Sequence, residues 1–501
     1  MDVLDLIPEE DLIKKLQIIR NSLLDVEEQN QNLLDKVHIN YRYNAKNFLR
    51  YLKFRTYDIT GIQGDLTALG ISSLSHAERH VLANIENILY LLTAHIGEHF
   101  IGKHPFGKHP INYKESANCL REHTTRLFGN HIDKQGIMVT LPSDGTSIDF
   151  LSGLLEAGMN IARINCSHDS VDVWKEMIGN LKEACKIQKR ECSIYMDLAG
   201  PKLRIAEIKN KNLEFVNQLK VYQGDRILLV NDFNELPSHL NHEAIINCTI
   251  PEIIDDVLKG QSILFDDGKI EGRIENVSQN TVQIKILNTN PKGGKLKLEK
   301  GINLPETHLN LPSLTQDDIN NLDFVCANAD IVGFSFVRKL EDIDQLQKEL
   351  KKRNRKDIGM VLKIENREAF QNLPYLLLKA MESPTIGVMT ARGDLAVELG
   401  VERLSEVQEE IMWLCEAALI PNIWATQVLE SLAKKGIASR AEITDAAMSV
   451  RTECIMLNKG PYIVKALKTL NAILSRMEKH QSKKQGTLRS LNVATEFWNK
   501  I

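Results

Sequence analysis

The chain has 501 residues, with 62 Lys and Arg against 66 Asp and Glu, which gives a net charge of −4. This balance excludes the basic excess typical of proteins that bind nucleic acid or anionic membranes, so we expect neither partner. The acidic first residues and the lack of an uncharged apolar run of roughly 18 residues indicate neither a signal peptide nor a membrane span. The eight cysteines are scattered without a zinc-binding spacing, so we expect reduced thiols in a cytoplasmic protein.

Residues 1–135 carry apolar residues at helical spacing among many charged ones, most clearly at 4–37, 43–56 and 81–96. They show no strand pattern. We therefore predict an all-α N-terminal extension, and its role stays open between packing on the rest of the chain, self-association and partner binding.

From residue 136 the pattern changes to short apolar runs that alternate with amphipathic segments. The predicted strands are 137–140, 159–164, 192–197, 330–334, 359–363, 385–389, 422–425 and 454–457. Helical segments lie between most of them, and eight such units are the count of a (β/α)8 TIM barrel.

The alternation breaks at 203–300, where Val- and Ile-rich runs are split by turn residues, including a hairpin turn at Asp267 and Gly268. We predict a small inserted β-barrel lid domain here, after the third strand. The expected domains are thus 1–135 (extension), 136–202 and 301–480 (barrel), 203–300 (lid) and 481–501 (tail).

Polar side chains follow six of the predicted strands at their carboxyl ends, which is where barrel enzymes hold their sites. A lone Lys or Asp at a strand end is as often a structural ion pair as a catalytic group, but packing does not explain six successive cases. These residues are Arg163, Asn165, Ser167, Asp197, Lys202, Arg204, Ser335, Lys363, Glu365, Gly393, Asp394 and Thr426.

The chemistry of this set favours a polyanionic substrate. Glu365 and Asp394 suit Mg²⁺ or Mn²⁺, which bind oxygen ligands and leave positions to substrate phosphate. The surrounding cations supply the charge neutralisation that phosphoryl transfer requires. Gly393 would let a substrate carboxylate approach the backbone amides.

The residues at these strand ends also resemble one family closely, pyruvate kinase. The matching stretches, in the order typical of the family, are 158–168, 196–204, 300–305, 335–339, 362–366, 390–395, 425–431 and 439–442. The resemblance implies Mg²⁺-dependent transfer of phosphate from phosphoenolpyruvate to ADP, giving pyruvate and ATP, in a homo-oligomer that is a dimer or a tetramer.

The resemblance also implies residue roles. Lys363, Thr426 and Arg163 would act on the phosphoryl group and the enolate, with the amides of Gly393 and Asp394 on the substrate carboxylate. Nucleotide contacts would come from Asn165, His168, Arg204 and Lys300. Glu365 and Asp394 would hold the divalent metal, and Asn165, Ser167 and Asp197 a monovalent cation.

Lys202 bears on that monovalent cation. Many members of the family carry Glu there and require K⁺, whereas members with Lys, usually together with Leu at the position of Leu198, do without it. We therefore expect K⁺-independent activity, with the lysine ammonium replacing the charge of the ion.

The sequence departs from the family pattern in four places. Ala199 replaces a usual Lys, and the Ser-Gly-Glu-Thr segment after the last strand is missing, since the chain reads Met-Leu-Asn-Lys-Gly-Pro-Tyr at 456–462. The usual C-terminal regulatory domain has no room, so allosteric control there is not expected, and residues 1–135 match nothing in the family. Two alternatives stay open: a catalytically weak scaffold or regulator, and a barrel acting on another enolate or 2-oxo acid.

Overall fold

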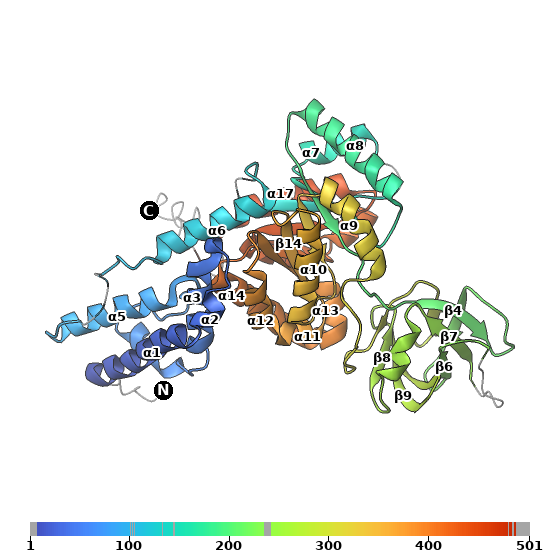
Figure 1. Ribbon diagram of the computed structural model, residues 1–501, viewed down its shortest axis with the longest axis horizontal. Helices are drawn as coiled ribbons and strands as arrows, with labels where there is room; N and C mark the ends of the chain where they lie inside the picture. Colours follow the sequence, from blue (N-terminus) through green and yellow to red (C-terminus); the bar gives the residue numbers. More distant parts are fainter. Residues whose placement is uncertain are drawn as a thin grey trace, which may run out of the picture.

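The structure is a computed structural model that describes residues 8–100, 102, 104, 106–132, 134–143, 146–234, 242–478, 480–482 and 485–486. Its centre is a barrel, with a helical extension on one side and a β-rich lid on the other (Figure 1). Most of the predicted tail, 481–501, lies outside the described residues, and its described part holds the two short paired strands β18 (Gln481–Ser482) and β19 (Gln485–Gly486).

The N-terminal extension is helical, as its periodicity predicts. Along the first helix the residues Leu12, Leu16, Ile19 and Leu23 are buried, a spacing of three or four that lines one face. This face packs on α3 and α5, and α3 in turn packs on α14 of the barrel. The helices are α1 (Glu9–Gln29), α2 (Gln31–Leu34), α3 (Arg42–Phe54), α4 (Thr60–Ala68), α5 (Val81–His95) and α6 (Tyr113–Phe128).

The barrel is closed by eight parallel strands in the ring order β1-β17-β16-β15-β14-β13-β3-β2. The strands are β1 (Gly136–Thr140), β2 (Ile161–Asn165), β3 (Ser193–Asp197), β13 (Ile331–Phe334), β14 (Gly359–Ile364), β15 (Ile386–Ala391), β16 (Asn422–Ala425) and β17 (Cys454–Leu457). All eight predicted strands are present, and the predicted (β/α)8 barrel is confirmed.

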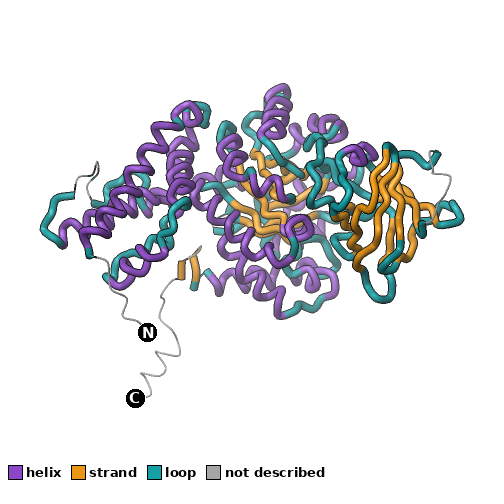
Figure 2. Tube along the Cα trace, turned by 90° about the horizontal axis from the view of Figure 1, so that it is seen from below, coloured by secondary structure: helices purple, strands orange, loops and turns teal. Residues whose placement is uncertain are grey.

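Helices surround the strands, as the tube view in Figure 2 shows. They are α7 (Ile148–Glu156), α8 (Val171–Gln188), α9 (Gln316–Asn328), α10 (Leu340–Lys352), α11 (Arg367–Gln371), α12 (Leu373–Ala380), α13 (Arg392–Leu399), α14 (Val401–Ala418), α15 (Glu430–Lys435), α16 (Arg440–Met448) and α17 (Ile463–Met477). None of the helices in the described part of the chain is both long and apolar enough to cross a bilayer.

The chain leaves the barrel after β3 and returns before α9, as predicted. In between lie β4 (Ile205–Asn210), β5 (Gln218–Val221), β6 (Arg226–Val230), β7 (Ala244–Cys248), β8 (Ser262–Phe265), β9 (Ile270–Ser278), β10 (Thr281–Asn288), β11 (Gly294–Lys297) and β12 (Ile302–Asn303). They form a seven-stranded and a two-stranded sheet that share one apolar core. The hairpin predicted at Asp267 and Gly268 joins β8 to β9.

The amino-terminal mouth of the barrel is closed by the extension. Leu127 and Phe128 of α6 and the following Ile132 belong to one apolar cluster with the barrel interior. A Cβ atom added to Gly359 or Gly387 would lie 2.6 or 2.5 Å from the Leu127 side chain. These two strands therefore carry glycine where the plug presses on them.

Candidate active site

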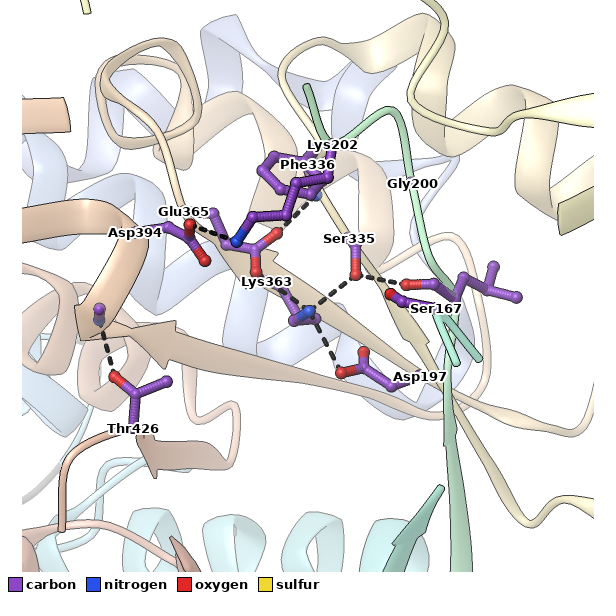
Figure 3. A network of polar contacts seen from close by, with 12 residues as sticks. Ser167, Asp197, Gly200, Lys202, Ser335, Phe336, Lys363, Glu365, Asp394 and Thr426 are labelled. Atoms are coloured by element: carbon purple, nitrogen blue, oxygen red, sulfur yellow. Dashed lines mark hydrogen bonds and ion pairs between the residues drawn. The ribbon is translucent and has the colours of Figure 1, made fainter. Parts of the chain in front are cut away.

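The carboxyl-terminal mouth holds a buried network of charges centred on Lys363 of β14. Its Nζ lies 2.7 Å from Ser335 Oγ, 3.0 Å from Glu365 Oε1 and 3.2 Å from Asp197 Oδ2 (Figure 3). Lys363 and Glu365 are two residues apart on one strand, which puts both side chains on the same face. Lys363 is 7% exposed, Glu365 3% and Asp197 1%, so the network is desolvated.

Arg163 of β2 completes this network. Its Nε donates to Asp197 Oδ2 at 3.0 Å, and its Nη1 donates to Thr140 Oγ1 at 2.9 Å. Burial alone would raise the pKa of Asp197, but the charges of Lys363 and Arg163 lower it below its ordinary value. Likewise burial would lower the pKa of Lys363, and Asp197 and Glu365 raise it instead. Both groups are therefore charged at neutral pH.

Glu365 and Asp394 are the two carboxylates predicted to hold a divalent cation. Burial raises the pKa of Glu365; Lys363 opposes that rise, and the negative charges of Asp394 and Asp197 add to it. A cation beside Glu365 and Asp394 would relieve that repulsion. No cluster of three or more His, Cys, Asp or Glu residues that could hold a metal occurs in the described part of the chain. Two carboxylates with the remaining positions left to water and substrate is a pattern that fits Mg²⁺.

Thr426 and Gly393 lie next to this pair. Thr426 Oγ1 accepts a hydrogen bond of 2.7 Å from the Gly393 amide, so the two predicted substrate contacts are brought together. Thr426 has a φ of +66°, unusual for a β-branched residue, and Gln427 and Leu429 also have positive φ values. Such strained backbone often occurs at functional sites, where the surrounding structure holds it in place.

Arg392 holds this strained turn, and the sequence reasoning did not assign it a role. Its Nε donates to the Ala425 carbonyl at 3.1 Å, its Nη2 donates to the Thr426 carbonyl at 2.6 Å, and it also pairs with Asp445. Its guanidinium lies 4.3 Å from the centre of the Trp424 ring. Only its place between Ala391 and Gly393 hinted at this role.

Asp318 is a second residue that the sequence reasoning missed. Its carboxylate accepts hydrogen bonds from the amides of Ala199 and Gly200, at 2.9 and 3.1 Å, and closes the capping box with Thr315 at the start of α9. It thus fixes the turn by which the chain leaves the barrel. A Thr followed three residues later by Asp was the available signal.

The predicted nucleotide contacts are distributed over two places. Asn165 and His168 line a cavity of about 220 Å³ together with Arg163 and Thr140. Burial lowers the pKa of His168, and the nearby Arg204 lowers it further. Lys300 instead pairs with Asp266 of the lid at 2.8 Å, and Arg204 Nη1 donates to the Glu299 carbonyl at 3.0 Å. Asn165 and His168 are thus on the barrel, and Arg204 and Lys300 on the lid connections.

Lys202, predicted to replace the charge of a monovalent cation, pairs in the structure with one of the two carboxylates predicted to hold the divalent cation. Its Nζ is 2.8 Å from Asp394 Oδ1, on the divalent-cation side of the site (Figure 3). Of the expected set, Asn165 Oδ1 accepts from the Ser167 amide at 3.2 Å, and Asp197 Oδ1 is buried without a hydrogen-bond partner.

Comparison with known proteins agrees with this geometry. Residues 132–466 match the family described as pyruvate kinase, barrel domain. The chain is 32% identical over 354 residues to the pyruvate kinase of Bacillus licheniformis and 33% over 352 residues to that of Geobacillus stearothermophilus, each match covering 69% of this chain and 57% of the relative. The pyruvate kinase of Clostridium perfringens is 31% identical over 358 residues, covering 69% of this chain and 71% of the relative.

Proposed function

Since the chain belongs to the pyruvate kinase family, we propose that it transfers phosphate from phosphoenolpyruvate to ADP, giving pyruvate and ATP. The chain spans 57% of the length of the first two relatives it matches. We therefore base the proposed activity on the residues of the site and not on the relatives' whole length. The observation that carries the proposal is the buried Lys363, whose ammonium is held between Asp197 and Glu365.

The charged residues would act by position and electrostatics. The Lys363 ammonium would neutralise the transferring phosphoryl group and then the enolate oxygen, and Arg163, which also pairs with Asp197, would add a second cation. Because both are already oriented by Asp197 in a desolvated site, little reorganisation accompanies the reaction. Asn165 and His168 on the barrel, and Arg204 and Lys300 on the lid connections, would bind the nucleotide.

Glu365 and Asp394 would hold Mg²⁺ or Mn²⁺, which when bound supplies charge neutralisation for the phosphate and enolate oxygens. The amides of Gly393 and Asp394, with Thr426, would bind the carboxylate of phosphoenolpyruvate. Thr426 would also lie on the path by which the enolate is protonated to pyruvate. The lid would close over the nucleotide and exclude water, which would otherwise compete as the phosphoryl acceptor.

The test is pyruvate formation from phosphoenolpyruvate, ADP and Mg²⁺, measured with and without K⁺. We expect turnover in both, because the ammonium of Lys202 supplies the positive charge that K⁺ would otherwise bring to the site. Turnover that requires K⁺ would contradict the K⁺ independence alone. Absence of turnover in both would contradict the assigned reaction and favour the catalytically weak scaffold, for which the missing Ser-Gly-Glu-Thr segment after β17 is the argument. Turnover of another enolate donor or 2-oxo acid would favour the altered-substrate alternative.

A further inference from the structure

Lys202 sits on the segment that leads from the barrel into the lid. It follows the turn at Gly200 and precedes β4, and Thr249 of the lid donates to its carbonyl oxygen. Its Nζ lies over the ring of Phe336, 5.9 Å from the ring centre. The tip of the side chain reaches back to the barrel and contacts Asp394 Oδ1 at 2.8 Å.

The returning connection of the lid is fastened to the same helix. Asn303 of β12 donates its Nδ2 hydrogen to Glu398 Oε1 at 2.9 Å. Asp394 and Glu398 are four residues apart on α13, so their side chains lie on one face of it. Both connections between barrel and lid are therefore tied to α13, one by an ion pair and one by a neutral donor.

These two ties differ in what a divalent cation would do to them. Asp394 is one of the two carboxylates assigned to the cation, whereas Glu398 is not. A Mg²⁺ ion bonds a carboxylate oxygen at about 2.0–2.1 Å. An ammonium already in contact with the same carboxylate would then lie within a few Å of a doubly charged ion, and their repulsion in this partly desolvated site is large.

We infer that Lys202 is an internal competitor for the divalent-cation site, and that the cation must displace its ammonium from Asp394. The displacement releases one of the two ties between α13 and the lid connections. Cation binding is thereby linked to lid movement. The apparent cation affinity is lower than the intrinsic one, because part of the protein has Lys202 paired with Asp394 and cannot bind the cation there. The inference rests on the proposed function only in taking Asp394 as a cation ligand.

The test measures Mn²⁺ binding to the full chain by calorimetry, without substrates. Lys202→Met keeps an unbranched side chain and removes the charge, and we expect it to bind Mn²⁺ about tenfold more tightly than the wild type. Lys379→Met is the matched control, because Lys379 pairs with Asp344 and Glu382 on the outside of the barrel. It removes the same charge and should leave the Mn²⁺ affinity unchanged.

Hydrogen exchange provides the second measurement. In the wild type, Mn²⁺ should increase exchange in the lid connections, 199–205 and 299–305, and in Lys202→Met exchange there should be high already and insensitive to Mn²⁺. Unchanged or weaker Mn²⁺ binding by Lys202→Met would overturn the inference. So would binding that survives Asp394→Asn, since the cation would then lie elsewhere. Pyruvate formation by the wild type is measured separately. The proposed reaction can therefore be confirmed even if the inference about Lys202 is wrong.

Discussion

The two mouths of the barrel are built from the same eight strands but have opposite chemistry. At the amino-terminal mouth, Leu127, Phe128 and Ile132 form an apolar plug supplied by the N-terminal extension. At the carboxyl-terminal mouth, Arg163 and Lys363 are held by buried carboxylates. The plug stabilises the fold, because it removes apolar surface from water. The charged mouth costs free energy to bury, so we explain its residues by the ligands that they can bind.

The largest effect should come from the cation carboxylates. Asp394→Asn and Glu365→Gln should each reduce turnover by about a thousandfold or more, since the charge that holds the metal is removed from the place where negative charge develops. Initial rates over a wide range of Mg²⁺ concentrations would measure this. A loss below tenfold at saturating Mg²⁺ would show that these carboxylates are not the cation ligands.

At the opposite mouth, Leu127→Ala should lower the free energy of unfolding by about 2–5 kcal/mol, because it leaves a cavity in the plug. Turnover of the folded protein should stay within a factor of two.

Gly387→Ala should also destabilise the wild type, because its Cβ would lie 2.5 Å from Leu127 Cδ2. In the Leu127→Ala background that clash is gone, so denaturant unfolding of the two single variants and the double variant should be non-additive. Additive changes would contradict the contact.

The extension should also respond to acid. Burial, together with the nearby charges of Arg79 and His109, lowers the pKa of His80 to about 4. Between pH 6.5 and about 4 the unfolded chain then binds a proton that the folded chain does not, so stability falls as the pH drops through this window, by up to about 3 kcal/mol. Burial and the charge of Arg126 likewise lower the pKa of His123 to about 4.

Melting temperatures at pH 7 and pH 5 measure this effect. His80→Gln isolates the contribution of one histidine, because the buried Glu365, with its raised pKa, changes stability in the opposite direction in both proteins. We expect the variant to lose less stability between the two pH values than the wild type. An equal loss would show that His80 does not titrate as its burial requires.

The smallest expected effect concerns the capping box at the start of α16. Ser439 and Glu442, part of one of the stretches that match the family, form a capping box at the start of α16, and Glu442 also accepts from the Ser431 amide. Ser439→Ala should therefore cost about 1 kcal/mol of stability and leave turnover unchanged, as thermal melts and initial rates would show. A large loss of turnover would give this motif a role in substrate binding.

The barrel could be predicted because its signals are local. Each strand is a short apolar run between turn residues, and their number and alternation with helices point to one closed fold. The plug could not, because Leu127 meets Gly359 and Gly387 more than 200 residues later in the sequence, and nothing near α6 encodes that contact. Helix periodicity predicts a buried face but not its partner.

For the site, too, the sequence predicts local features but not long-range contacts. The spacing of Lys363 and Glu365 predicts a shared face, and the strand ends predict a shared mouth. Two contacts depend on long-range geometry. Lys202 pairs with Asp394, which is 192 residues away, and Arg392 donates to the carbonyl of Thr426. The resemblance placed the charge of Lys202 at the site, whereas the structure gives it a particular carboxylate partner.

Whether the charged mouth of the barrel transfers phosphate can be tested by comparing the wild type with a variant that lacks the Lys363 ammonium. Initial rates of pyruvate formation from phosphoenolpyruvate, ADP and Mg²⁺ should be measured for the wild type and for Lys363→Met, with the fold of both checked by thermal melting. We predict clear turnover by the wild type and a loss of at least about a thousandfold in a variant that still melts cooperatively. Equal rates from the two proteins, or no turnover by a folded wild type, would contradict the assignment of phosphoryl transfer to this site.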